Sequence, residues 1–387
     1  MSNKKVAFIY LQKGLTTVPS LMSFLELLSR NGYVVDIFSI KDEKSLLRLQ
    51  NVHLHSFPGY YGKNFALAGL TIATAILVIL WRCISTREKY SYLIGVHLFG
   101  LFAGTVISLL FRVPHIYYNL EMYFTKELNS PLWNLCKKIE ICCSRRSLWT
   151  ITLDRWHVRL LSKEHGIRQD KFLILPNTAI GPARKERSRL LHEIYGLSED
   201  KKIILTMGSR FFTSKYRDQI LEASRSLPSD CVLFVHLGRV PDQIKRNSFG
   251  QHVIFGDRFI PYGSLNELYG SAYLGIVLYE NEDRPAGGRN QTYMGLSSGQ
   301  FNFYVRCGVP CITTPQPTFK WIFNRYRCGV ATDEFRDLSK LIQDVESDYD
   351  NFVGASLSFY EETLRFEKYF DGLSEKIFMT NKPVVGK

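Results

Sequence analysis

The stretch NQTYMGLSSGQFNFYVRCGVPCI (residues 290–312) predicts more about this chain than any other. It begins with a small, hydroxyl-bearing turn, continues as a helix that Gly308 closes, and ends in a short strand. The first N–H groups of a helix have no intrahelical partner and lie at the positive end of the helix dipole, so this turn favours an anion such as phosphate. The alternative is that it is an ordinary helix cap. The turn consists of Gly295, Ser297, Ser298 and Gly299.

Strand and helix patterns alternate on both sides of this stretch. Residues 4–10 and 33–40 are β-branched and aromatic runs, and an apolar helix pattern at 20–32 lies between them. Gly14 lies in the loop before that helix. A strand, a glycine-containing loop, a helix and a second strand form a parallel βαβ unit. A new series of strands starts at 202–210, and the whole pattern predicts an α/β protein with doubly wound sheets.

Length and charge narrow the classes of protein that remain. The 387 residues suffice for two domains, and a hydrophobic share of 45% excludes disorder for most of the chain. The formal charge of +13 would attract nucleic acid, an anionic membrane surface or phosphorylated small molecules. No nucleic-acid motif accompanies the charge, so we expect no nucleic-acid partner. The basic helix pattern at 131–149 is either a solvated face or a contact with an anionic membrane.

Two apolar runs, at 65–81 and 91–111, approach the length of a membrane span. A true span would split the βαβ series, so the sequence favours a helix that is buried or lies on a membrane surface, then a strand at 91–97 and another helix. An integral membrane protein is the alternative. The eight cysteines lie in apolar segments without metal-ligand spacing, which predicts a reducing, cytoplasmic location. The first apolar run, at 6–11, is too short for a signal peptide.

Other loops carry side chains that suit a ligand. Glu121 follows a strand pattern at 113–124, so its carboxylate either serves an acceptor or simply ends the strand at the surface. Arg210 and Lys215 follow Gly208. The planar guanidinium of an arginine and the mobile ammonium of a lysine together suit a pyrophosphate. Solvated loop cations would give the same pattern. Residues 281–289 predict a mobile loop.

The segment at 290–312 resembles the nucleotide-sugar site of GT-B glycosyltransferases, and more closely a bacterial retaining subgroup of family-4 type. The resemblance covers nearly the whole chain in the order of its strands and helices. It implies two Rossmann-like domains that face each other across a cleft: an acceptor-side domain at 1–180, a linker at 181–200, a nucleotide-sugar domain at 201–335, and helices at 336–387 that cross back. The matching residues are Asn290, Gly295, Ser297, Ser298, Gly299, Tyr304, Gly308, Pro310 and Ile312.

The resemblance also implies an activity and roles for residues. The activity is transfer of a hexose from a nucleotide sugar to a lipid-linked or polysaccharide acceptor at the cytoplasmic membrane face, with retention. No metal or other cofactor is expected. Glu121, Arg210 and Lys215 would be catalytic. The implied donor-binding residues are Gly14, Gly208, Phe259, Tyr279, Asn290, Gly295, Ser297, Ser298, Gly299, Gln300 and Tyr304.

Two positions depart from the family pattern. Gln300 replaces a lysine beside the phosphates, and Phe303 replaces a glutamate that commonly contacts the ribose. Loss of one charge-assisted hydrogen bond costs about 1.5–3 kcal/mol, or roughly ten- to a hundredfold in affinity. A catalytically inactive relative that serves as a binding or scaffold subunit is therefore the alternative to an enzyme.

Overall fold

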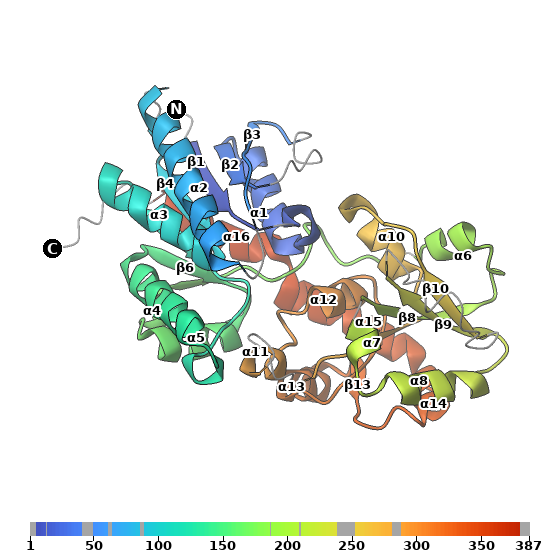
Figure 1. The fold of residues 1–387 in the computed structure, drawn as a ribbon. Helices are drawn as coiled ribbons and strands as arrows, with labels where there is room; N and C mark the ends of the chain where they lie inside the picture. Colours follow the sequence, from blue (N-terminus) through green and yellow to red (C-terminus); the bar gives the residue numbers. More distant parts are fainter. Residues whose placement is uncertain are drawn as a thin grey trace. The chain divides into compact units, whose positions relative to one another are not determined.

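A computed structural model describes residues 5–12, 14–40, 49–60, 64–85, 89–185, 187–208, 210–237, 252–280 and 288–379. Within these ranges, the side chains of Phe65, Arg210 and Met379 are not described. The chain divides into two compact units (Figure 1). Unit 1 comprises Met1–Ala179, Arg284–Ala286 and Phe366–Lys387, and unit 2 comprises Ile180–Asp283 and Gly287–Arg365.

Unit 1 is built on a seven-stranded sheet in which every neighbouring pair is parallel. The strand order is β3-β2-β1-β4-β5-β6-β7. The order reverses between β1 and β4, and ligands of such sheets bind beyond the carboxyl ends of the strands at this switch point. The strands are β1 (Lys5–Tyr10), β2 (Val34–Ser39), β3 (Val52–Ser56), β4 (Tyr92–Val96), β5 (His115–Tyr118), β6 (Trp149–Thr152) and β7 (Phe172–Ile174).

The helices of unit 1 cover this sheet. Apolar side chains of α2 and α3 pack together over β1, β2 and β4, and the two helices lie side by side (Figure 1). The C-terminal α16 packs on α1, where the rings of Phe370 and Phe24 are 6.0 Å apart. The helices are α1 (Pro19–Arg30), α2 (Phe65–Ser85), α3 (His97–Phe111), α4 (Pro131–Arg146), α5 (Arg155–His165), α16 (Phe366–Ser374) and the π-helix η8 (Glu375–Met379).

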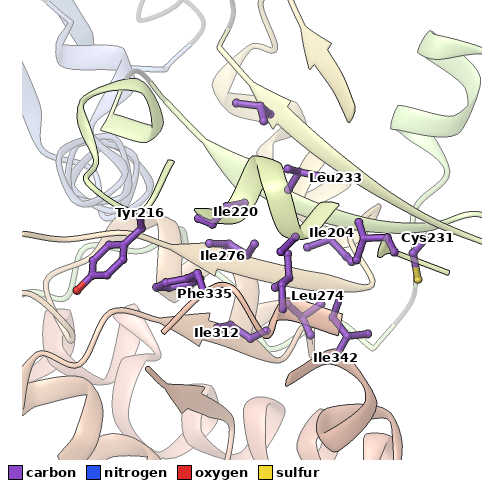
Figure 2. Close-up of a cluster of buried hydrophobic side chains, with 14 of the residues drawn as sticks. Ile204, Tyr216, Ile220, Cys231, Leu233, Leu274, Ile276, Ile312, Phe335 and Ile342 are labelled. Carbon is purple, nitrogen blue, oxygen red and sulfur yellow. The ribbon is translucent and has the colours of Figure 1, made fainter. Parts of the chain in front are cut away.

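Unit 2 is built on a six-stranded parallel sheet with the order β10-β9-β8-β11-β12-β13. Its switch point lies between β8 and β11. Figure 2 shows the main core of this unit, in which isoleucine and leucine side chains of β8, β9, β11 and β12 meet Phe335 and α14. The strands are β8 (Lys202–Met207), β9 (Cys231–His236), β10 (Val253–Gly256), β11 (Leu274–Val277), β12 (Cys311–Thr313) and β13 (Gly329–Ala331).

Short helices connect the strands of unit 2, and helices α14 and α15 follow the last strand. The π-helix η7 ends the unit. The helices are α6 (Leu190–Tyr195), α7 (Arg210–Thr213), α8 (Arg217–Ala223), α10 (Leu265–Gly270), α11 (Arg289–Thr292), α12 (Gly299–Arg306), α13 (Pro317–Tyr326), α14 (Leu338–Glu346), α15 (Tyr349–Phe359) and η7 (Tyr360–Leu364).

The predicted α/β fold with two doubly wound parallel sheets is confirmed. The apolar run at 91–111 is a strand followed by a helix, as the sequence indicated. Asp154 caps α5 and accepts hydrogen bonds from the N–H groups of Trp156 and His157. The sequence did not predict α6, which lies inside the charged stretch 181–200, nor α13 and β13.

Candidate functional site

The start of α12 is a capped turn with two unpaired amides. Ser298 has an extended backbone, and its Oγ accepts a hydrogen bond of 3.1 Å from the N–H of Phe301. Within the part of the chain that the structure describes, the N–H groups of Gly299 and Gln300 have no hydrogen-bond partner. Two free donors at the positive end of a helix dipole are what an anion site requires, and the anion site itself remains a prediction.

A buried, uncharged network holds this cap in place. The hydroxyl of Tyr279 lies 2.8 Å from Ser298 Oγ, and the N–H of Tyr279 donates to Thr314 Oγ1 over 2.9 Å. Thr314 Oγ1 donates to Gln316 Oε1 over 2.6 Å, and Gln316 Nε2 donates to the carbonyl of Tyr279. The network joins the carboxyl ends of β11 and β12 to the cap, so the sheet fixes the direction of the two free amides.

Gly295 allows the turn to approach α13 closely. A Cβ atom on Gly295 would lie 2.6 Å from Thr318 Oγ1, and that hydroxyl donates to the carbonyl of Met294. Ser297 is buried, and its Oγ lies 3.3 Å from the sulfur of Met294. A larger residue at position 295 would therefore push the turn away from α13.

The loop after β8 lies at the same edge of the sheet, at the switch point. Gly208 has a φ of +83°, a left-handed conformation that favours glycine. Glu280, after β11, accepts hydrogen bonds from the hydroxyl of Ser214 and, over 3.3 Å, from the N–H of Lys215. The Lys215 ammonium lies 4.8 Å from the centre of the Tyr216 ring. The side chain of Arg210 lies outside the described residues.

Gln300 and Tyr304 both face the sheet. Gln300 Nε2 donates to the carbonyl of Ile276 over 3.3 Å. Tyr304 is fully buried, its hydroxyl donates to the carbonyl of Leu205 over 2.7 Å, and its ring fills the space where Gly275 has no side chain. A direct contact between Tyr304 and the donor remains a prediction. Tyr304 supports the sheet beneath the turn.

The remaining predicted residues of unit 2 differ in exposure. Asn290 is buried in α11, and Phe259, in the loop after β10, is 76% exposed. Phe303 is buried and stacks on Tyr269 of α10 with 5.1 Å between ring centres. The phenylalanine that replaces the family's glutamate therefore lies in the core. Residues 281–287, most of the predicted mobile loop, lie outside the described residues.

Gly14 and Glu121 lie in unit 1, in the loops after β1 and β5. Gly14 has a φ of +81°, and a Cβ there would lie 2.9 Å from Thr17 Oγ1. Glu121 is exposed, and its Oε2 accepts a hydrogen bond of 2.8 Å from the hydroxyl of Tyr123. Both residues are at the carboxyl edge of the sheet, where the sequence predicted them, and their roles remain predictions.

Glu121 lines a pocket of unit 1. His97 also lines it, at the first position of α3, with a φ of +54°. Burial lowers the pKa of His97, although Glu121 and Glu140 oppose the shift. A positive φ is uncommon for a residue other than glycine, so His97 is a candidate functional residue. The walls include Leu98, Phe99, Leu128, Trp133 and Tyr123.

The floor of this pocket is a buried group of charges. Lys137 Nζ lies 2.9 Å from Glu140 Oε2 and 2.9 Å from His165 Nε2, and the hydroxyl of Tyr117 donates to Glu140 over 2.5 Å. Burial raises the pKa of Glu140, but the Lys137 ammonium and the other partners outweigh it and the pKa is lowered. Burial, with the Lys137 charge, lowers the pKa of His165 to about 4.

Sequence reasoning missed the residues that support both sites. Thr314 and Gln316 follow the strand of the key segment by a few positions, and polar residues directly after a buried strand were the signal to look for. Lys137 and Glu140 belong to the basic helix pattern at 131–149, for which the sequence predicted a solvated face or a membrane contact and no buried ion pair. Their burial follows from the packing of α4, which no local pattern shows.

Metal binding by side chains finds no support in the described residues. Among these, no group of three or more His, Cys, Asp or Glu side chains is placed to hold a metal ion. Independence from metals remains a prediction about the reaction.

Comparison with known proteins identifies the fold. No protein-family model and no curated protein matches the sequence. Among solved structures, sucrose-phosphate synthase from Thermosynechococcus elongatus superposes with a TM-score of 0.72 at 13% identity, over 98% of this chain and 100% of that one. The chain has the GT-B fold. Anabaena HepE in complex with UDP-glucose matches with a TM-score of 0.67 at 15% identity, over 96% of this GT-B chain and 99% of that one.

A third GT-B likeness is to WaaG, a glycosyltransferase involved in lipopolysaccharide biosynthesis. Its TM-score is 0.63 at 15% identity, over 96% of this chain and 99% of that one. Identities this low establish the fold alone. The two sheets are the two Rossmann-like domains of the GT-B architecture, and each has its switch point between the first and fourth of its strands along the chain.

Proposed function

We propose that the protein transfers a sugar from a nucleotide sugar to a glycan or lipid-linked acceptor, without a metal ion and with retention of configuration. The donor diphosphate binds at the start of α12. The observation that carries this proposal is the pair of unpaired amides of Gly299 and Gln300. Two oriented N–H groups and a helix dipole stabilise a leaving diphosphate as its charge develops.

Other groups of unit 2 complete the donor site. Lys215 supplies an exposed positive charge, and Glu280 holds its backbone at the end of β11. The exposed ring of Phe259 suits a nucleobase, because base and ring stack through their faces. Arg210, which follows Gly208 in the same loop, is the second cation that we assign to the diphosphate.

Unit 1 supplies the acceptor side. Its pocket combines an aromatic wall that contains Trp133 with the carboxylate of Glu121. A sugar presents C–H groups that pack on an aromatic face and hydroxyls that donate to carboxylates, so this lining suits a saccharide acceptor. Glu121 and His97 are the polar groups that we assign to the acceptor.

The alternative of an inactive scaffold rested on Gln300 and Phe303. Phe303 packs against α10, and Gln300 keeps its backbone amide available while its side chain bonds to the sheet. Neither replacement therefore closes the anion site. The likeness to HepE in complex with UDP-glucose also supports a nucleotide-sugar donor.

A thermal-shift screen tests the donor proposal directly. The protein is heated with UDP, GDP and ADP and with their sugar conjugates. A ligand at a hundred times its dissociation constant stabilises the folded protein by about 2.7 kcal/mol, so one nucleotide series should raise the melting temperature clearly. Arg210→Ala should abolish that shift, whereas Arg217→Ala, which removes an arginine paired with the neighbouring Asp218, should retain it. No shift with any nucleotide would overturn the proposal.

A further inference from the structure

An exposed apolar surface runs along α2 and onto the end of α3 in unit 1. The exposed positions of α2 include Leu70, Ala73, Leu77, Trp81 and Ile84, which recur every three or four residues and so form one stripe. Trp81 is 67% exposed and Ile84 is 69% exposed. In a soluble protein, a helix that covers a sheet normally has polar side chains on its outward stripe. The five side chains of this stripe are all apolar.

The end of α3 extends this surface. Leu109, Leu110 and Phe111 are exposed in the last turn of α3, which packs beside α2. Both helices lead into parallel strands of one sheet, so their C-terminal ends reach the same edge of that sheet (Figure 1). We call this surface, made of the five α2 residues and these three, the apolar face. Soluble monomers rarely expose a contiguous patch of this kind without a partner.

Positive charges border the apolar face. Lys89 follows α2, and Arg112 follows α3 as its exposed C-cap. Arg145 and Arg146 end α4, the next helix along the same sheet edge. The sequence contains no Asp or Glu in 65–85, in 89–120 or in 141–153, and Glu88, directly before Lys89, is the one acidic residue between the first two of these segments. Apolar side chains with a tryptophan, inside a rim of cations, match a bilayer with anionic headgroups.

We propose that the apolar face docks unit 1 onto an anionic phospholipid surface, with α2 lying in the plane of the interface. A second copy of the chain fits less well, because two such rims would bring like charges together. By length and composition α2 could cross a membrane, and among the described residues it is the one helix that could. A crossing would place β3 and β4, strands of one sheet, on opposite sides of the bilayer. This inference does not depend on the proposed function.

Vesicle flotation with the full-length protein tests the proposal. Wild-type protein should float with phosphatidylglycerol vesicles and much less with phosphatidylcholine vesicles, and alkaline carbonate should release it. The double variant Leu77→Glu/Trp81→Glu should lose binding while it keeps its melting temperature, because both side chains are exposed. Flotation equal to wild type in this variant would overturn the proposal. Resistance to carbonate, or a wild-type dimer that the variant converts to a monomer without vesicle binding, would overturn it as well.

A charge-matched pair of variants tests the positive charges around the apolar face separately. Arg112→Glu should weaken binding to phosphatidylglycerol vesicles at least fivefold, since each cation near an anionic surface contributes about that factor. Arg327→Glu is the control, because Arg327 is also the exposed, left-handed C-cap of a helix, α13, but lies in unit 2. It should bind as wild type does. Equal effects of the two changes would contradict a specific rim.

Discussion

The two candidate sites rest on opposite kinds of buried polar groups. In unit 2, hydroxyls and amides of Tyr279, Ser298, Thr314 and Gln316 hold the start of α12 without any charge. In unit 1, the floor of the pocket is an ion pair beside a neutral histidine. A neutral network keeps its hydrogen bonds over a wide pH range, whereas a buried charge group is stable only while each partner keeps its protonation state. The stability of unit 1 should therefore be the more sensitive to pH and to single substitutions.

Acid should cause the largest difference in stability between the two units. Burial lowers the pKa of His165 and of His115, both in unit 1, to about 4 from an ordinary value near 6.5. The unfolded chain then binds more protons between these values, so stability should fall as pH drops from about 6.5 to about 4 and should not depend on these groups above that window. The loss is about 3 kcal/mol for each histidine.

Urea unfolding followed by tryptophan fluorescence measures this loss, because four of the five tryptophans, Trp81, Trp133, Trp149 and Trp156, lie in unit 1. The double variant His115→Gln/His165→Gln should show a shallower dependence on pH. The same slope in the variant and in wild type would show that other groups carry the effect.

Removal of one partner of the ion pair should have the next largest effect. Lys137→Met leaves the Glu140 carboxylate buried without its cation, and a broken buried pair costs about 3–5 kcal/mol of unfolding free energy. Lys138→Met removes the same charge from the neighbouring exposed position and should change stability by less than about 0.5 kcal/mol. If the two variants unfold alike, the charges of the floor are not what stabilises unit 1.

Affinity for the donor should depend on a backbone donor in unit 2. Proline is well tolerated at the first position of a helix, and Ser298 already has the extended backbone that a following proline requires. Gly299→Pro therefore removes one amide donor and should weaken nucleoside diphosphate binding by about ten- to a hundredfold. Gly299→Ala keeps the N–H and should bind as wild type does in calorimetry. Similar losses in both would attribute the effect to side-chain bulk.

The smallest effect should come from the cap itself. Ser298→Ala removes the acceptor for the Phe301 N–H and the partner of the Tyr279 hydroxyl, with an expected cost of about 1–2 kcal/mol in unfolding free energy. Ser297→Ala, one position earlier, gives up a contact with the sulfur of Met294 and should cost less. Chemical denaturation of both variants distinguishes them. A larger cost for Ser297→Ala would show that Ser297, and not Ser298, stabilises the turn.

Local patterns in the sequence predicted the parallel sheets because buried strands and amphipathic helices alternate with short loops. They also predicted the capped turn at Ser298 and the carboxyl-edge positions of Gly14 and Glu121, since each of these follows from neighbours along the chain. The supporting contacts could not be predicted in this way. The place of Tyr304 in the motif predicts a site residue. Its hydroxyl, however, donates a hydrogen bond to the carbonyl of Leu205, about a hundred residues earlier in the chain.

The return of α16 to unit 1 has a consequence for synthesis. The ring of Phe378 lies 4.6 Å from that of Tyr33 and 5.3 Å from that of Tyr92, and Phe370 packs on Phe24. These two phenylalanines are translated after the last residue of unit 2, so part of the core of unit 1 stays open until unit 2 has been made. Unit 2, whose residues are contiguous except for a short insertion, is complete earlier. In the cell the half that is made first should finish folding second.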